Sequence, residues 1–538
     1  MMPPLGNEEL KLATSVVVTA QQMQAVEAAI FAAGMPIAAL MEKVAGKITR
    51  WIVQHFPRDR TPRVGIIVGP GHNGGDALVV ARELHHRGYQ ILLWCPFDHV
   101  KDLTSQHQAY GDYLGLRSTR TVDELSCCDL IIDGGFGLGL ARPLTGDLAA
   151  GIRTLNTGTV PVVSIDLPSG LDSNTGEVLG IAVQATHTLC LGLWKLGLLQ
   201  DRAQPWVGQC HLIPFDVPLT ALQPVLLDQP PPCCLTATAA IARLPLPRSP
   251  IAHKYTVGHA LLIAGSRQYA GAALLAAQGA IASGVGMLTI VVPESLRLMV
   301  VSHLPDALVI GAAETPSGAI AALPAEWDWD RYDVVACGPG LTADAATVVD
   351  AVVQSDRPLV LDADGLNYLA QDDPEGRLST RSAPTLLTPH VGEFRRLFPQ
   401  HWQTAESPSG AASQAAIAAN CTIVLKGAMS AIAHADGQLW FNTASSPALA
   451  RGGSGDVLTG LVMGIAAQLA PIAVTDTMML DAAIAAVWWH AQTGRAIAAQ
   501  NTDLGCPASR LAQQLPRVLA QQLNRAHASR SQAESVSG

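Results

Sequence analysis

The sequence contains few charged and few aromatic side chains, and its basic residues form no cluster. Charged residues make up 14% of the chain and aromatic residues 5%. The 44 acidic residues outnumber the 34 basic ones, which gives a net charge of -10. Nucleic acid and anionic membrane surfaces are bound through dense basic patches, so neither is an expected partner. We therefore expect small-molecule substrates.

Patterns typical of a zinc site, of secretion and of a membrane span are also missing. The ten cysteines include no Cys-x-x-Cys pair, and no histidine pair at zinc spacing lies near them. Residues 1–11 lack the basic segment and apolar core of a secretory signal. The most apolar run, residues 272–292, divides into a small-residue helix and a β-branched strand at 287–292. Free thiols without an export signal are typical of a cytoplasmic protein.

Apolar and small residues are abundant instead. Apolar residues make up 49% of the 538 residues, and 48 residues are glycine. A chain of this length is too long for one hydrophobic core, so we expect two or more domains. The composition is typical of a large α/β enzyme with closely packed helices.

The first half begins with a nucleotide-binding pattern. Residues 19–56 carry apolar residues at helical spacing, interrupted at 34–36, which predicts two helices. Residues 64–68 form a short apolar strand, and the glycine-rich loop 69–76 follows it before a helix over 77–86. A strand, a glycine loop and a helix in this order predict a right-handed crossover of the Rossmann type.

Acidic residues end two further apolar strands of the first half. Asp133 ends the run 129–133 and Asp166 ends the run 162–166, each before a glycine-bearing loop. The carboxyl ends of neighbouring parallel strands meet at one crevice, so Asn73, Asp133 and Asp166 are expected to lie together. Oxygen ligands suit a hard cation, and Asp166 could instead exchange a proton with a substrate. The alternative is that these residues cap helices or turns.

Four motifs of the first half, in this order, resemble the NAD(P)H-hydrate epimerase domain. They are Met41-Glu42 with Ala45-Gly46, Asn73-Gly-Gly-Asp76, Asp133 with Phe136-Gly-Leu-Gly139 and Arg142, and Asp166-Leu-Pro-Ser-Gly170. The resemblance implies a Rossmann-like fold that interconverts the R and S forms of hydrated NADH and NADPH, with Asp166 handling the proton. It implies a potassium ion near Asn73, Asp133 and Ser169. It also implies substrate contacts at Asp166 and at His72, Asn73, Gly74, Gly75, Asp76, Gly137, Leu138, Gly139, Leu140, Ala141, Arg142 and Pro143.

A proline-rich stretch at 223–235 separates the two halves and predicts a linker. Beyond it, apolar strands again run into polar, glycine-bearing loops. This pattern is typical of a site at one edge of a parallel sheet. The strands expected here are 260–263, 334–337, 359–361, 386–387 and 422–425.

The stretch 451–460 combines four small residues with Asp456 and an apolar run that predicts a helix. Glycines let the backbone approach an anion closely, and the start of a helix directs free N–H groups and a positive dipole end at phosphate. Asp456 beside phosphate would accept a proton from a nucleophile or hold a metal. The alternative is a glycine-rich turn in which Asp456 caps the helix.

These segments together resemble the ADP- or ATP-dependent NAD(P)H-hydrate dehydratase domain, which has a ribokinase-like fold. The resemblance implies phosphorylation of the hydrate's C6 hydroxyl with Asp456 as base, followed by loss of phosphate, and Mg²⁺ with the nucleotide. It implies hydrate contacts at Ala272, Gly340, His390 and Asp456. It implies nucleotide contacts at Lys426, Gly427, Ala428, Met429, Ser430 and Gly455.

We therefore expect an α/β protein with a Rossmann-like domain followed by a ribokinase-like domain. The expected parts are an epimerase domain over 1–222, the linker over 223–235, a dehydratase domain over 236–524 and a disordered polar tail over 525–538. The expected function is repair of hydrated NADH and NADPH at the expense of ADP or ATP, in a homo-oligomer. One alternative is a ribokinase-like small-molecule kinase fused to a nucleotide-binding domain. Another is a first half that binds nucleotide without catalysis, which the acids at the strand ends argue against.

Overall fold

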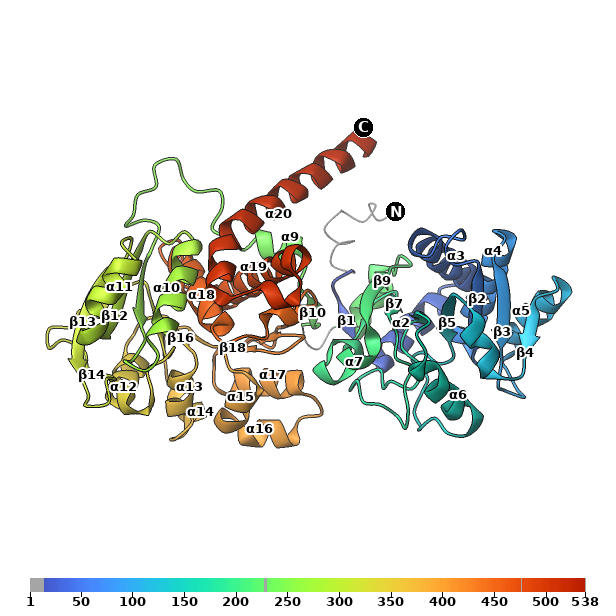
Figure 1. Ribbon diagram of the computed structural model, residues 1–538, viewed down its shortest axis with the longest axis horizontal. Coiled ribbons are helices and arrows are strands. Elements are labelled where there is room, and N and C mark those ends of the chain that lie inside the picture. The colour runs from blue at the N-terminus through green and yellow to red at the C-terminus, as the bar shows by residue number, and fades with distance from the viewer. Residues whose placement is uncertain (1–13, 227–229, 476, 538) are drawn as a thin grey trace. The chain divides into compact units, whose positions relative to one another are not determined.

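The computed structural model describes residues 14–226, 230–475 and 477–537, with side chains described up to residue 528. Internal contacts divide the chain into two compact units, with the division between Cys233 and Cys234. Both units have the α/β architecture that the sequence predicts (Figure 1). No helix among the described residues is long and apolar enough to cross a membrane. The ten cysteines, all of them among the described residues, form no disulfide.

The first unit is built on a seven-stranded sheet whose paired strands are all parallel. From β2 (Arg63–Val68), the strands that follow it in the chain are added first on one side of the sheet and then, from β5 (Leu130–Gly134) on, on the other side. This reversal places a crevice at the carboxyl ends of β2 and β5. A separate pair is formed by β1 (Val17–Val18) and β8 (Trp194–Lys195). The strands, in sheet order, are β4 (Arg117–Thr119), β3 (Gln90–Trp94), β2 (Arg63–Val68), β5 (Leu130–Gly134), β6 (Val162–Ile165), β7 (His187–Leu191) and β9 (Gln209–Ile213).

Helices cover both faces of this sheet because its strands are apolar on both sides. Ile66 and Ile132 pack with α3 (Ile37–His55) and α4 (His72–His86) on one face, whereas Ile67 and Ile131 pack with α6 (Gly146–Thr157) on the other. Thr19 is the N-cap of α2 (Ala20–Ala32) and forms a capping box with Gln22. The helices are α2 (Ala20–Ala32), α3 (Ile37–His55), α4 (His72–His86), α5 (Asp102–Tyr113), α6 (Gly146–Thr157), α7 (Gln204–Val207) and α8 (Leu219–Leu222).

The second unit contains an eleven-stranded sheet with a parallel centre and antiparallel edges. The parallel strands end at the edge where the predicted polar loops lie. In sheet order the strands are β10 (Cys233–Cys234), β20 (Leu439–Phe441), β19 (Ala431–Ala433), β18 (Thr422–Leu425), β17 (Thr385–Leu387), β16 (Leu359–Leu361), β15 (Val334–Cys337), β11 (His259–Ile263), β12 (Met287–Pro293), β13 (Leu308–Glu314) and β14 (Ile320–Ala322).

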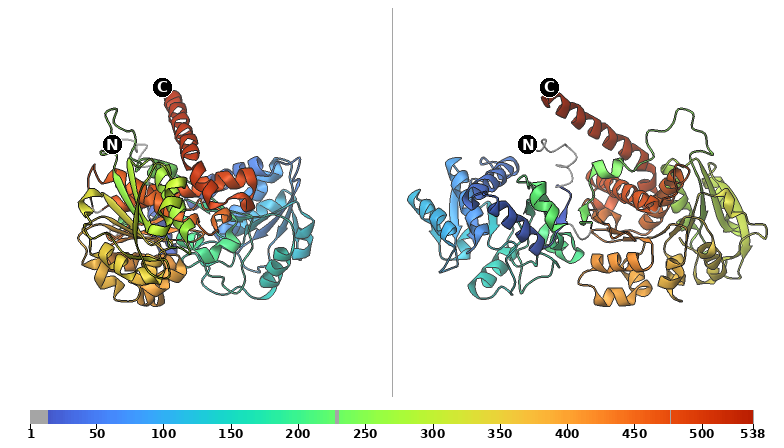
Figure 2. Two further views of the ribbon diagram at one scale, coloured as in Figure 1. Left: turned by 60° about the vertical axis from the view of Figure 1, so that its left-hand side comes forward. Right: turned by 180° about the vertical axis from the view of Figure 1, so that it is seen from behind.

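Two groups of helices lie on opposite faces of this second sheet, as the view from behind in Figure 2 shows. One group consists of α9 (Ala237–Ile241), α10 (Ala270–Ala282), α18 (Ser454–Leu469), α19 (Met478–Asn501) and α20 (Ala508–Ser537). The other consists of α12 (Ala346–Gln354), α13 (Asp364–Leu369), α14 (Pro374–Ser379), α15 (Val391–Leu397), α16 (Pro399–Thr404) and α17 (Pro408–Ala418). A further helix, α11 (Arg297–His303), follows β12.

Close packing of α10 on α18 explains the many small residues of this unit. A Cβ added to Gly460 would come within 1.7 Å of the Ala276 carbonyl oxygen. A Cβ added to Gly279 would come within 2.2 Å of the Val457 carbonyl oxygen. Backbones can approach this closely only where side chains are absent or small. The contact fixes the position of the α18 start, which carries Asp456.

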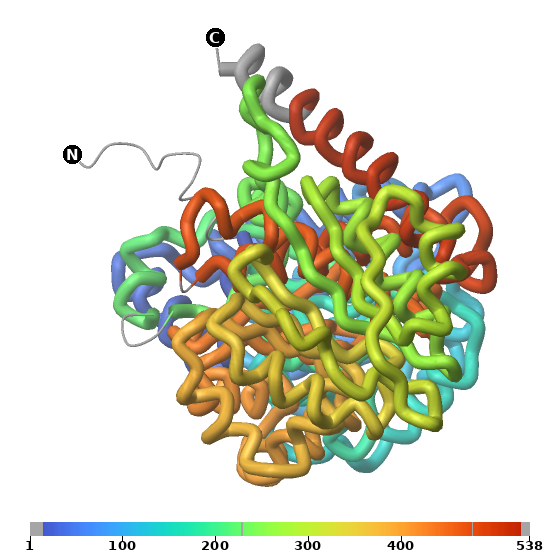
Figure 3. The backbone as a smooth tube through the Cα atoms, turned by 90° about the vertical axis from the view of Figure 1, so that its left-hand side faces the viewer, coloured from blue at the N-terminus to red at the C-terminus, as the bar shows by residue number. Residues whose placement is uncertain are grey.

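The disordered tail expected over 525–538 stays a prediction. The structure describes α20 up to Ser537, and the part of this helix that Figure 3 draws in red extends away from the body of the second unit. Alanine, arginine and glutamine are strong helix formers, so the end of α20 can extend a helix that packing has already begun.

Candidate active sites

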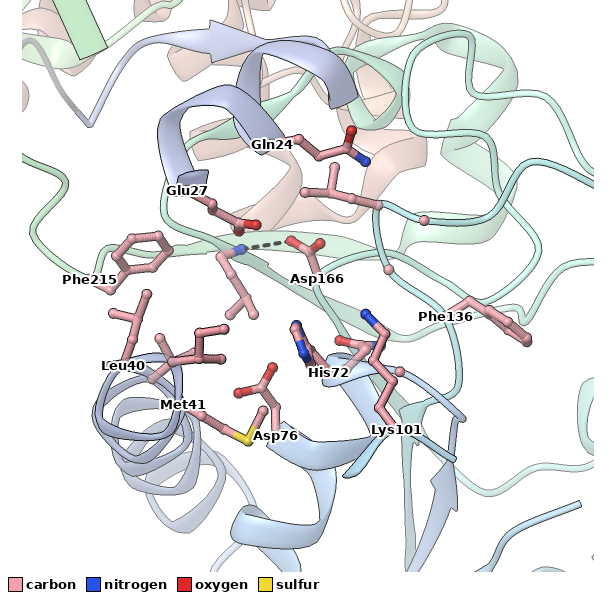
Figure 4. A pocket seen from close by; sticks show the side chains of 18 of the residues that line it. Gln24, Glu27, Leu40, Met41, His72, Asp76, Lys101, Phe136, Asp166 and Phe215 are labelled. Carbon is pink, nitrogen blue, oxygen red and sulfur yellow. Dashed lines mark hydrogen bonds between the residues drawn. The ribbon is translucent and has the colours of Figure 1, made fainter. Parts of the chain in front are cut away.

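A cavity of about 460 Å³ lies at the carboxyl ends of the strands in the first unit. The segments that follow β2, β5, β6 and β7 line one side, and side chains of α2 and α3 line the other (Figure 4). This is the crevice that the reversal of strand order predicts. Its size suits a small-molecule ligand.

Asp166 follows β6 directly and is held in a left-handed backbone conformation, with φ of 67°. Its Oδ1 lies 2.6 Å from Lys195 Nζ and accepts a 3.2 Å hydrogen bond from the Leu191 N–H. Its Oδ2 lies 3.0 Å from the place that a Cβ on Gly137 would occupy, so this oxygen faces the Gly137 loop. Non-glycine residues rarely adopt this conformation, which costs of order 1–3 kcal/mol and is found mostly at functional sites.

Lys195 is only 1% exposed, and it contacts Asp166 from β8. Burial alone would lower the pKa of Lys195, but the negative charge of Asp166, with Cys190 and Glu27, outweighs burial and raises it. The ammonium group also donates to the Leu191 carbonyl oxygen. Lys195 is therefore a charged, fixed partner of Asp166.

Two more carboxyl groups line the same cavity. Burial raises the pKa of Asp76 well above its ordinary value, and the negative charges of Asp166 and Glu27 raise it further. Burial also raises the pKa of Glu27, although the charge of Lys195 opposes this shift. The cavity thus contains one carboxyl group paired with an ammonium group and two carboxyl groups whose pKa values are raised.

The residues proposed for potassium surround the end of β5. Asp133 is fully buried and accepts hydrogen bonds from the Ser169 hydroxyl at 2.6 Å, the Ser169 N–H at 2.9 Å, the Ser164 hydroxyl at 2.8 Å and the Gly135 N–H at 3.1 Å. Burial raises the pKa of Asp133, while these hydrogen bonds lower it. Among the described residues, the buried Nδ2 of Asn73 has no hydrogen-bond partner.

The structure brings only part of the predicted substrate set to the cavity. His72, Asn73, Asp76, Gly137, Leu138, Gly139 and Asp166 line it, whereas Gly74, Gly75, Leu140, Ala141, Arg142 and Pro143 are not among the lining residues in the described part of the chain. Leu140 is buried in the core beneath α6.

The start of α4 also differs from the expectation of a loop up to residue 76. The helix begins at His72, so Asn73 to Asp76 form its first turns. A Cβ on Gly74 would come within 2.0 Å of the Gly69 carbonyl oxygen, and one on Gly75 within 2.7 Å of Met41 Cε. These glycines therefore serve close packing of the helix start, which turns Asp76 into the cavity.

In the second unit the glycine stretch forms the start of α18. Gly453 is the N-cap residue, with φ of 89°, and no side chain caps the helix. The alternative in which Asp456 caps the helix is therefore wrong, because Asp456 lies inside the first turn. Burial and the nearby charge of Asp362 raise the pKa of Asp456 to about 6, although the charge of Lys426 opposes the shift. A carboxyl group with this pKa suits a general base near neutral pH.

A buried ion pair lies beside this helix start. Asp362 is 2% exposed, and its carboxylate accepts from Lys426 Nζ at 2.8 Å and from the Thr459 hydroxyl at 2.6 Å. Burial would raise the pKa of Asp362, but Lys426 and the hydroxyl donors lower it. A Cβ on Gly455 would lie 3.4 Å from Lys426 Nζ. The ammonium group is thus next to the free N–H groups of α18, as a nucleotide phosphate site requires.

The other predicted contacts of this unit come from neighbouring loops. Gly340 adopts φ of 67°, and a Cβ there would lie 3.0 Å from the Ala272 Cβ, so the two predicted hydrate contacts are adjacent. His390 caps α15, and its Nδ1 accepts from the Gly392 N–H at 2.9 Å. The Ser430 hydroxyl donates to the Gly427 carbonyl oxygen at 3.2 Å, which closes the turn after Lys426.

A buried histidine under α18 gives a prediction for stability. His490 of α19 lies 3.0 Å from the Ser454 carbonyl oxygen through Nε2, and burial lowers its pKa to about 4. In the unfolded chain the His490 ring binds a proton below about pH 6.5, whereas in the folded chain it does so only near pH 4. The contribution of neutral His490 to the free energy of unfolding is therefore fully present above about pH 6.5 and is lost as the pH drops toward 4. We expect protonation of His490 in the unfolded chain to lower the free energy of unfolding by about 3 kcal/mol at pH 4.

Urea unfolding at pH 7 and pH 4 measures this effect. His490→Gln keeps a hydrogen-bond donor without a titrating ring, so its loss of stability between the two pH values should be smaller than that of the unchanged chain. The exposed His303→Gln is the matched control and should keep the full loss. Equal losses in all three proteins would contradict the prediction.

Several residues of both sites were not found from the sequence. No motif in the sequence marks Lys195 or Glu27, and only the fold brings them to Asp166. Asp362 was foreseeable as an acid directly after an apolar strand, but Thr459 was not. A cavity of about 280 Å³ lies at the opposite, amino ends of β17 and β18, away from all these residues.

Comparison with known proteins agrees with this division. Residues 37–197 match a family model described as YjeF-related protein N-terminus, and residues 260–517 match one described as NAD(P)H-hydrate dehydratase. The chain is 51% identical to a bifunctional NAD(P)H-hydrate repair enzyme of Thermosynechococcus vestitus, over 93% of this chain and 97% of the relative. It is 49% identical to the enzyme of the same name from Synechocystis, over 93% of this chain and 94% of that one.

Among solved structures, the ADP/ATP-dependent NAD(P)H-hydrate dehydratase of Bacillus subtilis, co-crystallised with ATP and Mg²⁺, is 33% identical. It covers 55% of this chain and 99% of its own length, with a TM-score of 0.45. The similarity to the two cyanobacterial relatives extends over nearly the whole chain, including both sites described above. The chain belongs to the family of bifunctional NAD(P)H-hydrate repair enzymes.

Proposed function

We propose that this protein repairs hydrated NADH and NADPH, with interconversion of the R and S forms in the first unit and dehydration of the S form in the second. The observation that carries the proposal is that, in a chain of this family, each unit places an acid at the edge of its sheet, near a lysine. Asp166 is paired with a buried ammonium group, and Asp456 has a pKa near 6. Two such sites in one chain support two chemical steps.

In the first unit the hydrate would occupy the cavity above Asp166. Asp166 Oδ2 would take the proton, because Oδ1 is held by Lys195 and Leu191. The free N–H groups at the start of α4 would face the substrate's phosphates. The cavity has room for one small-molecule ligand.

The residues proposed as potassium ligands fit this ion only in part. Hydroxyl, carboxylate and amide oxygens are the donors that a hard cation prefers. The unpaired atom of Asn73 is Nδ2, a hydrogen-bond donor, so it indicates a missing acceptor, whereas Asn73 Oδ1 would be the ligand of the ion. We propose that Asn73, Asp133 and Ser169 hold the ion, which would supply a fixed positive charge beside the substrate loop.

In the second unit ADP or ATP would place its phosphates on the free N–H groups of α18 and on Lys426. Asp456 would take the proton of the C6 hydroxyl, which would attack the transferred phosphoryl group. Loss of phosphate then restores the dihydropyridine, because phosphate leaves more readily than hydroxide. The described residues offer no cluster of three His, Cys, Asp or Glu side chains for a metal, so Mg²⁺ would be bound mainly by the nucleotide.

Absorbance of the reduced nicotinamide tests this function. Incubation of the protein with the S hydrate and either ADP or ATP should restore the NADH band, and the R hydrate should be repaired too. A ribokinase-like kinase, the competing function, would consume nucleotide with a small alcohol and leave the hydrates unchanged. Comparison of the two nucleotides in this assay also determines the preferred co-substrate.

We expect the second unit to work alone, because it has its own sheet and core. A truncated chain of residues 232–538 should dehydrate the S form at a rate within about threefold of the full chain. It should leave most of the R form behind, since only slow uncatalysed interconversion remains. A folded truncated chain that is inactive on the S form would contradict this division of labour.

We also propose a cytoplasmic homo-oligomer. Ten free thiols, most of them buried, are typical of proteins from reducing compartments. Size-exclusion chromatography with light scattering determines the number of subunits.

A further inference from the structure

The Asp166 cavity contains more acid groups than the proposed proton transfer by Asp166 uses. Among the described residues that line it, Glu27, Asp76 and Asp166 are carboxyl groups, and Lys195 is the buried cation. Lys101 also lines the cavity, but its side chain is exposed, beside His72. One buried ammonium group compensates one carboxylate, and a second uncompensated charge in such a place is costly.

Geometry divides these groups between two walls of the cavity. Asp166 follows β6 and is paired with Lys195, and Figure 4 shows Glu27 on the same side of the cavity. Asp76 rises from α4 on the facing wall, with its carboxyl group directed into the space between them (Figure 4). Met41 of α3 also lines the cavity and lies next to Gly75, so the cavity wall beside Asp76 is apolar.

The reaction proposed for this unit needs groups on both sides of a ring. Inversion at C6 removes oxygen from one face of the carbon and adds oxygen to the other. A single carboxyl group lies on one side only, so it serves one of the two steps. A proton donor on one wall and a proton acceptor on the other satisfy both.

We propose that Asp76 is a second catalytic group of this cavity, the proton donor that faces Asp166. This inference rests on the proposed epimerase function. Asp76 gives its proton to the C6 hydroxyl, which leaves as water with the electrons of the C6–O bond, while the ring nitrogen forms a double bond to C6. Water then adds to the other face and gives a proton to Asp166 Oδ2. Exchange with solvent returns a proton to Asp76 and removes one from Asp166, and in the opposite direction the two groups exchange roles.

The charges around the two residues favour Asp76 over Glu27 as the proton donor. The charges acting on Asp76 are the carboxylates of Asp166 and Glu27, and together with burial they raise its pKa. Glu27 also experiences the positive charge of Lys195, which favours its ionised form. Every charge that acts on Asp76 therefore favours its neutral form, whereas Asp166 forms an ion pair with Lys195.

Replacement of Asp76 in the full chain tests the assignment. Without nucleotide, Asp76→Asn should interconvert the R and S forms about 100-fold more slowly, because an amide donates a hydrogen bond but gives up no proton. Asp76→Glu carries the same group and should regain part of the rate. The exposed Asp112→Asn is the matched control. All three variants should bind the hydrate and dehydrate the S form at the unchanged rate.

Three outcomes would overturn the inference. Asp76→Asn could retain more than a tenth of the rate, or Asp76→Glu could be as slow as Asp76→Asn while binding the hydrate normally. Glu27→Gln could abolish interconversion where Asp76→Asn does not, which would assign the donor to the other wall. If the unchanged chain itself fails to interconvert the hydrates, the proposed epimerase function fails instead, so the two failures are distinguishable.

Discussion

Asp456→Asn is expected to slow dehydration of the S hydrate by ~100-fold to 10,000-fold, which corresponds to about 3 to 5 kcal/mol of barrier. The substitution keeps the volume of the side chain and removes the group that accepts the hydroxyl proton. Nucleotide affinity should survive or rise slightly, because backbone N–H groups of α18 hold phosphate and the carboxylate repels it. In the unchanged chain, kcat should fall as the pH drops through about 6, where Asp456 becomes protonated.

Three measurements on one preparation check this result: the melting temperature, the dissociation constant for nucleotide and the dehydration rate. Asp456 does not cap α18, so the melting temperature should change by little. The exposed Asp306→Asn is the matched control and should behave as the unchanged chain in all three. Wild-type turnover in Asp456→Asn would remove this residue from catalysis.

Asp166→Asn is expected to abolish interconversion of the R and S forms, with a loss of ~100-fold to 10,000-fold, and to leave dehydration of the S form intact. The substitution also leaves the buried Lys195 without its counter-charge, which typically destabilises a protein by about 3 to 5 kcal/mol. Loss of activity could therefore arise from loss of structure. Chromatography of the two hydrates during incubation measures the interconversion.

A double substitution separates these causes. Asp166→Asn with Lys195→Met removes both charges of the ion pair, so the first unit should regain stability. The double variant should nevertheless remain inactive, because the proton acceptor is still missing. Recovery of interconversion in the double variant would show that Asp166 serves the structure and not the reaction.

Much of the architecture was predictable because it depends on local patterns. Apolar runs such as 64–68 followed by glycine loops predicted buried parallel strands, and the structure confirms an α/β fold in both units. The motifs around Asp166 and Asp456 identified the family, which whole-chain similarity confirms. The predicted site residues themselves stay a proposal, including the ligands of potassium and nucleotide.

Other expectations failed where tertiary contacts outweigh local signals. The loop expected up to residue 76 is helical from His72, because Gly74 and Gly75 permit contact with Gly69 and Met41 that no single segment reveals. Asp456 is not a helix cap, since Gly453 takes that position in a left-handed conformation.

The sequence by itself determined the order of strands and helices along the chain, the positions of the glycines and the acids at the strand ends. These features follow from the periodicity of apolar residues and from the conformational freedom of the backbone. Only the tertiary structure decided which charges meet. Lys195 reaches Asp166, and Thr459 reaches Asp362, across long stretches of chain. The ionisation of a buried group depends on the charges and solvent around it in space, and spacing along the chain does not reveal them. For that reason the division between Asp166, which pairs with Lys195, and Asp76, whose pKa burial and neighbouring carboxyl groups raise, became visible only in the folded cavity.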